Sequence, residues 1–587
     1  MNSEKAGQPE AGFYRVLTAV ALLAALAGLA SVAHATYTLP ADRSVTWLGN
    51  VGVSGDIPAR TKIYRTLSAS GLDDSKAIQG ALDSCPPGQV VLLREGTFHV
   101  GSAVTVRSHT TLRGAGMGKT VIKGMPGMTG AYVAGIRGSY ATGPSLAISG
   151  GLSKGSSSIS TSAPHGWSAG DIILIDQLND PSGDPVVTSI GYDGTCTWCG
   201  RAGGTRSLGQ MVEVVSVPSA TSATLEIPLY WNYSSSLSPQ ATKYSDLTVN
   251  AGMEDFTVDN SLSGGANQDG DGGTLMLRGA ANSWILRVEA IGSYKSMVKV
   301  HDAYRNTVRG GKYHEGVPAL PSTGTQYGAG RAYGFFINPA ASANLFENNE
   351  LYHLVDMFMI NGAVSGNVFG YNYATEPYAA ASDWQLSVFD MHGGHPMMNL
   401  FEGNYSDARI STSDNVWGSS SHNTFFRNRN TLTPGKTRAP WNNDLQKNAT
   451  YYSFVGNVFG TLGVENVYDQ EKVALIGLKA IYRFGYTSDG DDGPSGNDPK
   501  VSATVLRHAN WDSYHGRTVY HGSDDRVLPA SLYLTGRPAW WGGRTAWPAV
   551  GPDLSPMYPT ARGAGKGTPW GSSSTPTDSP PTAHKVL

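Results

Sequence analysis

Asp and His residues that could transfer protons lie close together in the second half of this 587-residue chain. Asp390 and His392 alternate along one predicted strand, residues 388–392, and therefore point to the same side of it. Asp414 follows in a later segment of the same kind, and His301 precedes them in an earlier one. Carboxyl and imidazole groups serve as general acids and bases, and histidine changes charge near neutral pH. We therefore predict Asp390, His392, His301 and Asp414 as catalytic residues.

Polar and aromatic side chains near these four residues are candidates for substrate binding. If the predicted strands 298–302, 335–338, 358–361 and 388–392 stack, their outward side chains form a polar strip with a repeat of about 4.8 Å. An elongated sugar polymer suits such a strip, because successive strands can contact successive sugars and aromatic rings can stack on sugar faces. The alternative is that these His and Asn side chains form structural ladders and turn caps. The predicted binding residues are Lys299, Asn338, Asn361, Trp384, His395, Arg409, Trp417 and Arg438.

Two reactions on a polysaccharide are compatible with these residues, and both remain open. Elimination at a uronic acid needs groups that neutralise its carboxylate and a base that removes the adjacent proton. Hydrolysis needs two carboxyl groups, about 5–9.5 Å apart depending on the stereochemistry. For elimination, the neutralising groups would be Asn338 and Asn361 with Lys299 or Arg409, and the base His392 or His301. For hydrolysis, Asp390 would pair with Asp414, Asp383 or Asp302.

Metal-binding patterns in the sequence are weak. Two acidic Gly-rich turns, at residues 269–273 and 489–493, have the clustered oxygens that Ca²⁺ favours, but neither completes an EF-hand loop. Plain solvent loops are the alternative. His392 and His395 form a two-histidine pair that could bind a transition metal. Ca²⁺ is therefore the one cofactor that the sequence suggests, and no metal site is assigned.

The elements that would position these side chains repeat along the chain. Short apolar segments begin at Asn282, Asn306, Asn344, Asn367, Asn399 and Asn423, with a basic spacing of 23–24 residues and two longer intervals. Short strands at this period, separated by Asn and Gly turns, predict a parallel β-helix in which stacked Asn side chains bond from coil to coil. The longer intervals predict loops on one face, at residues 313–333 and 374–386, and residues 433–444 form a third loop.

The composition agrees with an all-β solenoid. Gly accounts for 73 residues, charged residues for 15% and hydrophobic residues for 40%. That is too much Gly and too little charge for a mainly helical protein, whereas the apolar content suffices for a large core. The formal net charge of −3 gives no basic footprint of the kind that nucleic-acid binders carry. We therefore expect an all-β protein that does not bind nucleic acid.

The N-terminal segment predicts export. Residues 16–33 form an almost uncharged apolar run after Arg15, and small residues flank His34 in the pattern that signal peptidase cleaves. We expect a signal peptide at residues 1–35, cleaved after Ala35, and no membrane span in the mature chain; a retained single-span anchor is the alternative. In an oxidising compartment, Cys196 and Cys199 predict a small structural disulfide. The expected location is extracellular, periplasmic or at the cell surface.

Four further segments complete the predicted organisation. Residues 73–85 predict an amphipathic helix whose apolar face includes Ile78, Ala81 and Leu82. Residues 152–229 have the pattern of an inserted β module, with strand candidates at 172–175, 211–217 and 224–227. The aromatic and Pro-rich segment 486–571 is expected to cap the end of the solenoid, and the tail 572–587 to be disordered.

The N-terminal helix and the strands behind it carry a family resemblance. The helix at residues 73–85, the strand that follows Gly88 and the turn from Thr111 to Gly118 resemble the N-terminal cap and first coils of the pectate lyase superfamily. The resemblance covers most of residues 54–122 and implies a right-handed parallel β-helix. That family contains polysaccharide lyases, glycoside hydrolases, phage tailspikes and non-catalytic adhesins, so the resemblance implies the fold more strongly than a reaction.

The catalytic signatures of that family do not transfer to this chain. The Asn-x-Asp, Asp-Asp and His-Gly set of the polygalacturonases is not reproduced, although His392 and Gly393 resemble its His-Gly element, and the Arg-centred signature of pectate lyases is absent from the sequence. We expect a secreted protein that cleaves an acidic or neutral polysaccharide. The alternative is a non-catalytic glycan-binding protein, an adhesin or an exopolysaccharide-associated surface protein. Residues 36–151 would form the N-terminal cap and first coils, and residues 230–485 the main β-helix.

Overall fold

The computed structural model describes residues 1, 36–139, 141–264, 272–316, 331–378, 383–470, 477–487, 497–521, 525–541 and 546–558. Several predicted features lie outside these residues: the N-terminal apolar run, much of the loop at 313–333, most of each acidic Gly-rich turn and the tail at 572–587. Among the described residues, no helix combines the length and the apolar character needed to cross a bilayer.

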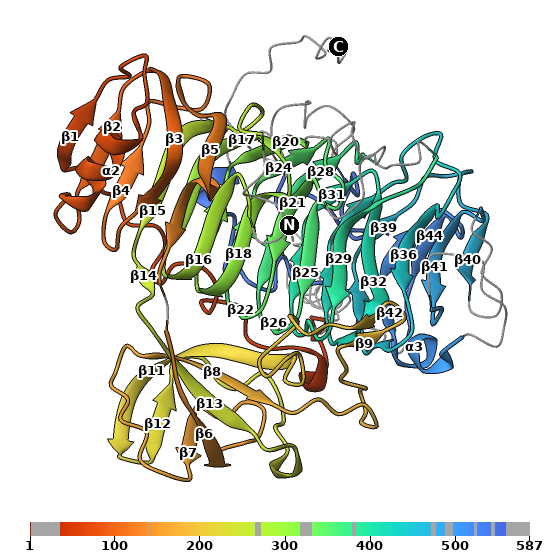
Figure 1. The fold of residues 1–587 in the computed structure, drawn as a ribbon. Helices are drawn as coiled ribbons and strands as arrows, with labels where there is room; N and C mark the ends of the chain where they lie inside the picture. Colours follow the sequence, from red (N-terminus) through yellow and green to blue (C-terminus); the bar gives the residue numbers. More distant parts are fainter. Residues whose placement is uncertain are drawn as a thin grey trace.

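Most strands belong to one parallel sheet that winds into a solenoid (Figure 1). Short strands pair with the equivalent strand of the next coil, and three such runs of strands form the wall. The first run is β16 (Leu275–Ala281), β18 (Ser296–Tyr304), β21 (Tyr333–Ile337), β25 (Phe358–Asn361), β29 (Ser387–Gly393), β32 (Arg409–Trp417), β36 (Trp441–Leu445) and β41 (Ala480–Phe484). The prediction of an all-β, right-handed parallel β-helix is confirmed.

The other two runs of strands carry the Asn repeats. The second run is β17 (Trp284–Ser293), β19 (Thr307–Arg309), β23 (Leu345–Glu347), β27 (Val368–Gly370), β30 (Leu400–Glu402), β34 (Thr424–Phe426), β38 (Ser453–Val455) and β42 (Leu506–His508). The third run continues from β17 through β20 (Lys312–Gly316), β24 (Glu350–Tyr352), β28 (Tyr373–Thr375), β31 (Tyr405–Ser406), β35 (Arg429–Asn430), β39 (Val458–Phe459) and β43 (Asn510–Asp512).

Two kinds of ladder hold successive coils together. Buried Asn side chains donate through Nδ2 to Oδ1 of the next coil's Asn, at 2.9–3.1 Å; one ladder runs through Asn306, Asn344, Asn367, Asn399 and Asn423, and another through Asn349, Asn372, Asn404, Asn428, Asn457 and Asn510. Inside the coils, the rings of Phe346, Phe369, Phe401, Phe425 and Phe454 stack with centroid distances of 4.4–5.2 Å. The predicted stacking of Asn side chains from coil to coil is confirmed.

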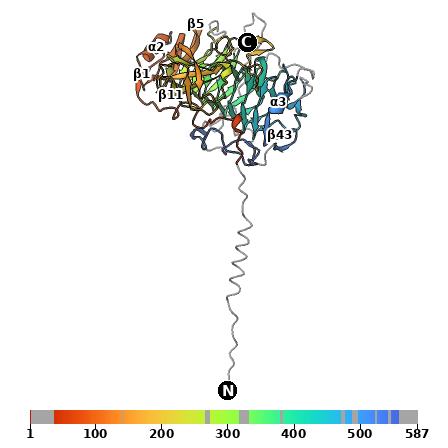
Figure 2. The same cartoon turned by 90° about the horizontal axis from the view of Figure 1, so that it is seen from below.

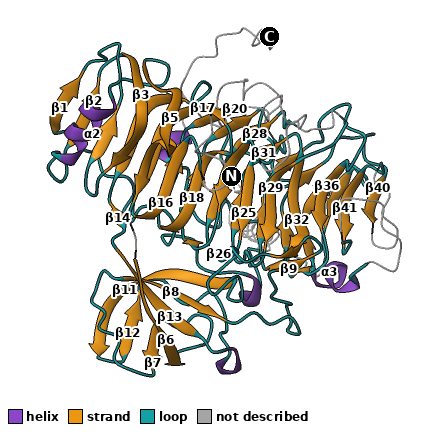
Figure 3. Cartoon of the chain, in the orientation of Figure 1, coloured by secondary structure: helices purple, strands orange, loops and turns teal. Residues whose placement is uncertain are grey.

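The N-terminal end of the solenoid is formed by one helix and five strands. Helix α2 (Ser75–Asp83) buries Ile78, Ala81 and Leu82 against the first coils, as predicted. The strands are β1 (Ile63–Leu67), β2 (Val90–Leu93), β3 (Gly96–Val106), β4 (Thr111–Arg113) and β5 (Thr120–Arg137). Helix α3 (Pro499–Thr504) lies toward the opposite end of the solenoid (Figure 3).

A closed β-barrel is inserted between β5 and the later coils (Figure 1). Its strands are β6 (Ala141–Gly150), β7 (Ser158–Thr161), β8 (Ile172–Gln177), β11 (Leu208–Ser219), β12 (Ser222–Leu225) and β13 (Gln240–Ser245). The barrel thus extends beyond the predicted limits of 152–229, because β6 and β13 pair with each other and close it. The chain returns to the solenoid through β14 (Thr248–Val249) and β15 (Gly252–Asp259), the latter pairing with β4 and β5.

The exit and return points of this insertion touch. A Cβ atom on Gly138 would lie 2.6 Å from the carbonyl oxygen of Asp246 and 2.8 Å from the nitrogen of Thr248. Only glycine fits such a close approach of two backbones. The solenoid therefore continues from coil to coil across the insertion.

The C-terminal segment covers one side of the solenoid rather than its end (Figure 2). Leu528, Tyr533 and Trp541 pack against Leu345, Val368 and Leu400, which are equivalent outward positions of three successive coils. The N-terminal lead joins the same cluster through Tyr37, Leu39 and Trp47. The expectation of an end cap is corrected, because these outward apolar positions need a lateral cover.

Candidate functional site

The polar strip lies on the outer side of the first run of strands. The alternate residues Val298, Val300, Phe335, Ile337, Phe358, Ile360, Phe389 and Met391 belong to the core of the solenoid. Their neighbours therefore face outward: Lys299, His301, Asn338, Asn361, Asp390 and His392. The predicted alternation of these side chains is thus present in the structure.

Asp390, His392 and Asp414 form one cluster on this strip. Each offers one potential ligand atom, and these atoms all lie within 4.8 Å of one another. His392 Nδ1 lies 2.6 Å from Asp414 Oδ2. The His392 side chain is 22% exposed and that of Asp414 9%, so His392 is the more accessible of these two. The mixed nitrogen and oxygen donors of the cluster could hold a divalent cation or act directly in proton transfer.

Asp356 is an additional acid beside this cluster, and the sequence analysis missed it. It lies two residues before β25 and accepts a hydrogen bond from the backbone of Ser387 in the next coil. Burial raises the pKa of the Asp356 carboxyl to about 6, and the charge of Asp414 adds to the increase, while Arg409 and His392 act in the opposite direction. A carboxyl group with this pKa keeps its proton into the mildly acidic range.

Two neighbouring groups complete the surroundings of the cluster. The pKa of Tyr333 is raised above its ordinary value, chiefly by burial and further by the charges of Asp356, Asp390 and Asp414. Arg409 is 2% exposed, and its Nη1 lies 3.2 Å from Asp444 Oδ2. Arg483 contacts the other oxygen of Asp444 at 2.9 Å. Arg409 is therefore held by an internal ion pair and not presented to a substrate.

The remaining polar residues of the strip lie apart from the cluster. His301 is paired with Asp302 and stands three coils from His392, roughly 14 Å at the usual strand spacing. Lys299 is fully buried, with Nζ 3.9 Å from the ring centroid of Phe336. Asn361 Nδ2 donates to Asn338 Oδ1 at 3.2 Å, and both residues are buried. These two Asn residues therefore fit the alternative role, in which they form a structural ladder and do not bind substrate.

His395 is buried away from the strip. Its ring nitrogens lie 2.8 Å from Ser419 Oγ and 2.9 Å from Ser421 Oγ, and its side chain has no exposed surface. Burial lowers the pKa of His395 to about 3. The structure therefore separates His395 from His392, and we do not retain it as a substrate-binding residue.

The predicted aromatic binding residues occupy two different loops. Trp384 packs against Arg438, whose guanidinium carbon lies 4.6 Å from the ring centroid, and the two residues form a β-bridge. This bridge joins the loops predicted at residues 374–386 and 433–444. Trp417 ends β32, three residues after Asp414, and pairs in register with Gly393.

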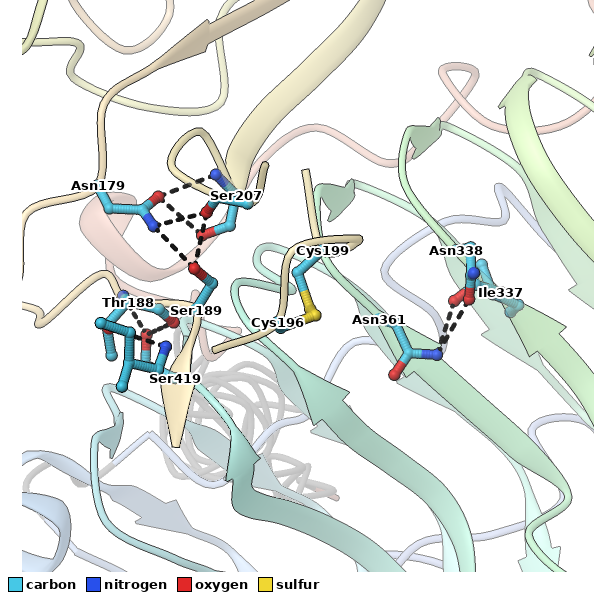
Figure 4. The surroundings of a disulfide bond; sticks show 12 residues. Asn179, Thr188, Ser189, Cys196, Cys199, Ser207, Ile337, Asn338, Asn361 and Ser419 are labelled. Atoms are coloured by element: carbon cyan, nitrogen blue, oxygen red, sulfur yellow. Dashed lines mark hydrogen bonds between the residues drawn. A yellow bond between two sulfur atoms is a disulfide. The ribbon is translucent and has the colours of Figure 1, made fainter. Parts of the chain in front are cut away.

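A loop of the inserted barrel packs against the strip beside Trp417. This loop, residues 178–207, connects β8 to β11 and is called the arm here; it contains the strands β9 (Ile190–Gly191) and β10 (Gly194–Thr195). Thr188 and Ser419 exchange hydrogen bonds, and the disulfide between Cys196 and Cys199 lies between them and Asn361 (Figure 4). The predicted disulfide is confirmed.

Comparison with known proteins agrees with this fold. Residues 70–148 match the family model described as rhamnogalacturonase A/epimerase, pectate lyase-like, and no curated protein matches the sequence. The match runs from helix α2 to strand β6, so this part of the chain is similar to pectate lyase-like proteins, and the described residues that follow continue the same parallel β-helix fold.

The solved structures that resemble this chain have low sequence identity to it and low TM-scores. The Gp54 tailspike of Acinetobacter baumannii bacteriophage AP22, in complex with capsular saccharide, is 12% identical with a TM-score of 0.40, over 75% of this chain and 69% of that one. The Streptococcus pneumoniae surface protein and adhesin PfbA is 11% identical with a TM-score of 0.37, over 76% and 97%. The polygalacturonase from Erwinia carotovora is 12% identical with a TM-score of 0.30, over 74% and 96%. With identities of 11–12%, the activities of these proteins cannot be assigned to this chain.

Proposed function

We propose that this protein is a secreted glycoside hydrolase that cleaves a neutral polysaccharide, with Asp356, Asp390, His392 and Asp414 as its catalytic group. The observation that carries the proposal is the raised pKa of Asp356 beside this acidic cluster. Two carboxyl groups held in different protonation states are what hydrolysis of a glycosidic bond requires.

Each of the four residues has its own role in the proposed reaction. Asp356, protonated up to about pH 6, donates a proton to the departing glycosidic oxygen. Asp390 serves either as the nucleophile or as the base that activates water, the two roles that the second carboxyl group of a glycoside hydrolase can take. Asp414 orients the His392 ring through the contact of 2.6 Å, and His392, whose side chain is 22% exposed, contacts a sugar hydroxyl of the bound substrate.

Electrostatics favour hydrolysis of a neutral glycan over elimination at a uronic acid. Besides the protonated Asp356, two acidic groups, Asp390 and Asp414, lie at the proposed cleavage position, and as carboxylates they repel a uronate unless a cation intervenes. The two cations that the sequence suggested as neutralising groups, Lys299 and Arg409, are 0% and 2% exposed. Neither can approach the carboxylate of a bound uronic acid in this arrangement.

Export is part of the proposal. The disulfide between Cys196 and Cys199 is of the kind that persists in oxidising compartments. It supports the predicted location outside the cytosol, following cleavage near Ala35. The direct check is N-terminal sequencing of the protein recovered from the medium or the cell surface; a mature chain that retains residues 16–33 would contradict this part.

The central experiment measures products from a panel of neutral and acidic polysaccharides. We expect reducing ends with a mass gain of one water per cleavage and no ultraviolet-absorbing unsaturated sugar. Asp390→Asn and His392→Ala should abolish cleavage while the thermal melting temperature stays close to that of the unaltered protein. An unsaturated product would establish elimination instead, and retention of a glycan without any product would establish the non-catalytic alternative.

A further inference from the structure

We propose that Trp198 is the sugar-stacking residue beside the cleavage cluster, and that the inserted barrel delivers it there. The proposal deepens the function above, because the ligand is a pyranose ring of the polysaccharide. Trp198 lies on the arm, between the two cysteines of the disulfide, and did not figure among the predicted binding residues.

Trp198 is close to the catalytic group because the arm is fixed to the end of β32. The backbone nitrogens of Tyr192 and Asp193 donate to the carbonyl oxygens of Asn415 and Val416, at 3.0 and 3.2 Å. These two acceptors directly follow Asp414 in the chain. The arm is thus joined to the same strand that holds the partner of His392.

The disulfide fixes the arm to the neighbouring strand as well. A Cβ atom on Gly393 would lie 2.6 Å from Cys199 Sγ, so the bridge packs directly on the residue that follows His392. A side chain in place of Gly393 would displace the arm. The four-residue ring closed by Cys196 and Cys199 restricts the backbone on both sides of Trp198.

The ring of Trp198 has the exposure that sugar stacking needs. The residue is 40% exposed, although its ring packs against Trp417 with a centroid distance of 6.4 Å and an interplanar angle of 63°. Rings inclined in this way cannot both lie flat on one sugar. We therefore assign the stacking contact to Trp198 and a positioning role to Trp417.

An indole ring in this place suits a pyranose. Its flat apolar face matches the axial C–H bonds of a sugar ring, and its quadrupole attracts their partial positive charge. Asp390, His392 and Asp414 supply the polar side of the same site. An apolar platform beside a few convergent polar groups is the usual composition of a small-molecule site.

The test compares Trp198→Ala with the unaltered protein on soluble gluco-, galacto-, manno- and xylo-oligosaccharides. We expect KM to rise about tenfold with kcat changed much less, because loss of one stacking contact weakens binding by about that factor. Trp198→Phe should restore most of the affinity. Tyr514→Ala is the matched control, since Tyr514 is an exposed aromatic residue elsewhere, at 48%.

Direct binding to the Asp390→Asn variant separates this proposal from the proposed reaction. The dissociation constant, measured by calorimetry, should increase about tenfold when Trp198→Ala is added. If cleavage is absent but this difference remains, the stacking site stands and the hydrolase proposal fails. If cleavage occurs and Trp198→Ala changes KM and the dissociation constant by less than twofold, the stacking site is wrong and the hydrolase proposal stands. If none of the oligosaccharides binds, the stacking site is also contradicted.

Reduction of the disulfide provides an independent measurement. A reductant should raise KM for the unaltered protein toward that of Trp198→Ala and leave Trp198→Ala itself nearly unchanged, because the affected contact is already missing there. The Cys196→Ser, Cys199→Ser double variant should behave like the reduced protein. An equal rise of KM in both backgrounds would show that the bridge does not act through Trp198.

Discussion

Asp356 connects the chemistry of the site to pH. Its pKa of about 6 results mainly from burial, so the proton is held below that pH and lost above it. We expect kcat/KM to fall with rising pH through about this value. Replacing the general acid, Asp356→Asn, should reduce kcat about 10²–10⁴-fold and remove that alkaline limb. A pH profile unchanged by Asp356→Asn would contradict the assignment.

The same raised pKa has a cost in stability. The folded-state pKa of Asp356, about 6, lies above the ordinary value of 3.8, so the folded protein binds the proton more tightly than the unfolded chain. The free energy of unfolding therefore decreases as pH rises through this window. We expect Asp356→Asn to be more stable than the unaltered protein above about pH 7, by up to about 3 kcal/mol, since each pKa unit corresponds to about 1.4 kcal/mol.

Urea denaturation at acidic and alkaline pH measures this effect. The difference between Asp356→Asn and the unaltered protein should disappear below the ordinary carboxyl pKa. Asp246→Asn, at an exposed position, is the matched control and should show no such difference. A loss of stability in Asp356→Asn at every pH would contradict the prediction.

Part of this site could be predicted from the sequence, for a physical reason. The alternation of Asp390 and His392 follows from the pleat of one strand, which local sequence determines. Asp356 was missed because it precedes its strand and because its pKa depends on burial by distant segments. Gly393 and Gly394 end the alternation, so His395 turns inward to Ser419 and Ser421. The burial of Lys299 and Arg409 likewise depends on packing that the strand pattern does not contain.

At the scale of the repeated coil, the Asn ladders are the main polar support of the solenoid. Asn404 donates through Nδ2 to Asn428 Oδ1 and to the carbonyl oxygen of Phe369, and its Oδ1 accepts from the side chain and backbone of Asn372. Removing the amide leaves buried partners unsatisfied, at about 1–3 kcal/mol each.

We therefore expect Asn404→Ala to lower the free energy of unfolding by about 3 kcal/mol or more. Guanidinium denaturation, monitored by intrinsic fluorescence, gives this quantity. Asn466→Ala, at an exposed position outside the ladder, should change it by less than about 0.5 kcal/mol. Equal effects of the two substitutions would show that the ladder contributes little.

The repeat period was sufficient to predict this part of the fold. Asn at the start and end of each short strand encodes the turns and the ladders locally, and stacking follows from the equal length of the coils. The C-terminal segment has no such period. Its place along the side of the solenoid depends on Leu345, Val368 and Leu400, which are far away in sequence. Its aromatic content indicated only that it would pack on an apolar surface of the solenoid, and not which surface.

At the scale of the whole molecule, the barrel and the solenoid share a hydrophobic core. The cluster inside the barrel includes Ala281, Tyr304, Ala340, Ala343 and Met397 from the solenoid. Tyr304 also donates to Glu226 of the barrel at 2.7 Å, and Arg305 pairs with Glu226 at 2.6 Å. Neither part can unfold without exposing apolar surface of the other.

We expect a single cooperative thermal transition for the whole chain. Differential scanning calorimetry should give one peak whose calorimetric and van't Hoff enthalpies agree, since both parts lose their packing together. Two separated peaks, with the circular dichroism of the barrel lost first, would contradict this prediction.

The contact of Gly138 with Asp246 and Thr248 makes the barrel a replaceable part. A domain whose two ends meet can be exchanged with little strain on the backbone of its host, provided that the replacement keeps the apolar surface that packs on Ala281, Tyr304 and Met397 of the solenoid. Evolution or a protein engineer could therefore change the arm, and with it the sugar preference, by substituting one module while every coil and both Asn ladders stay as they are.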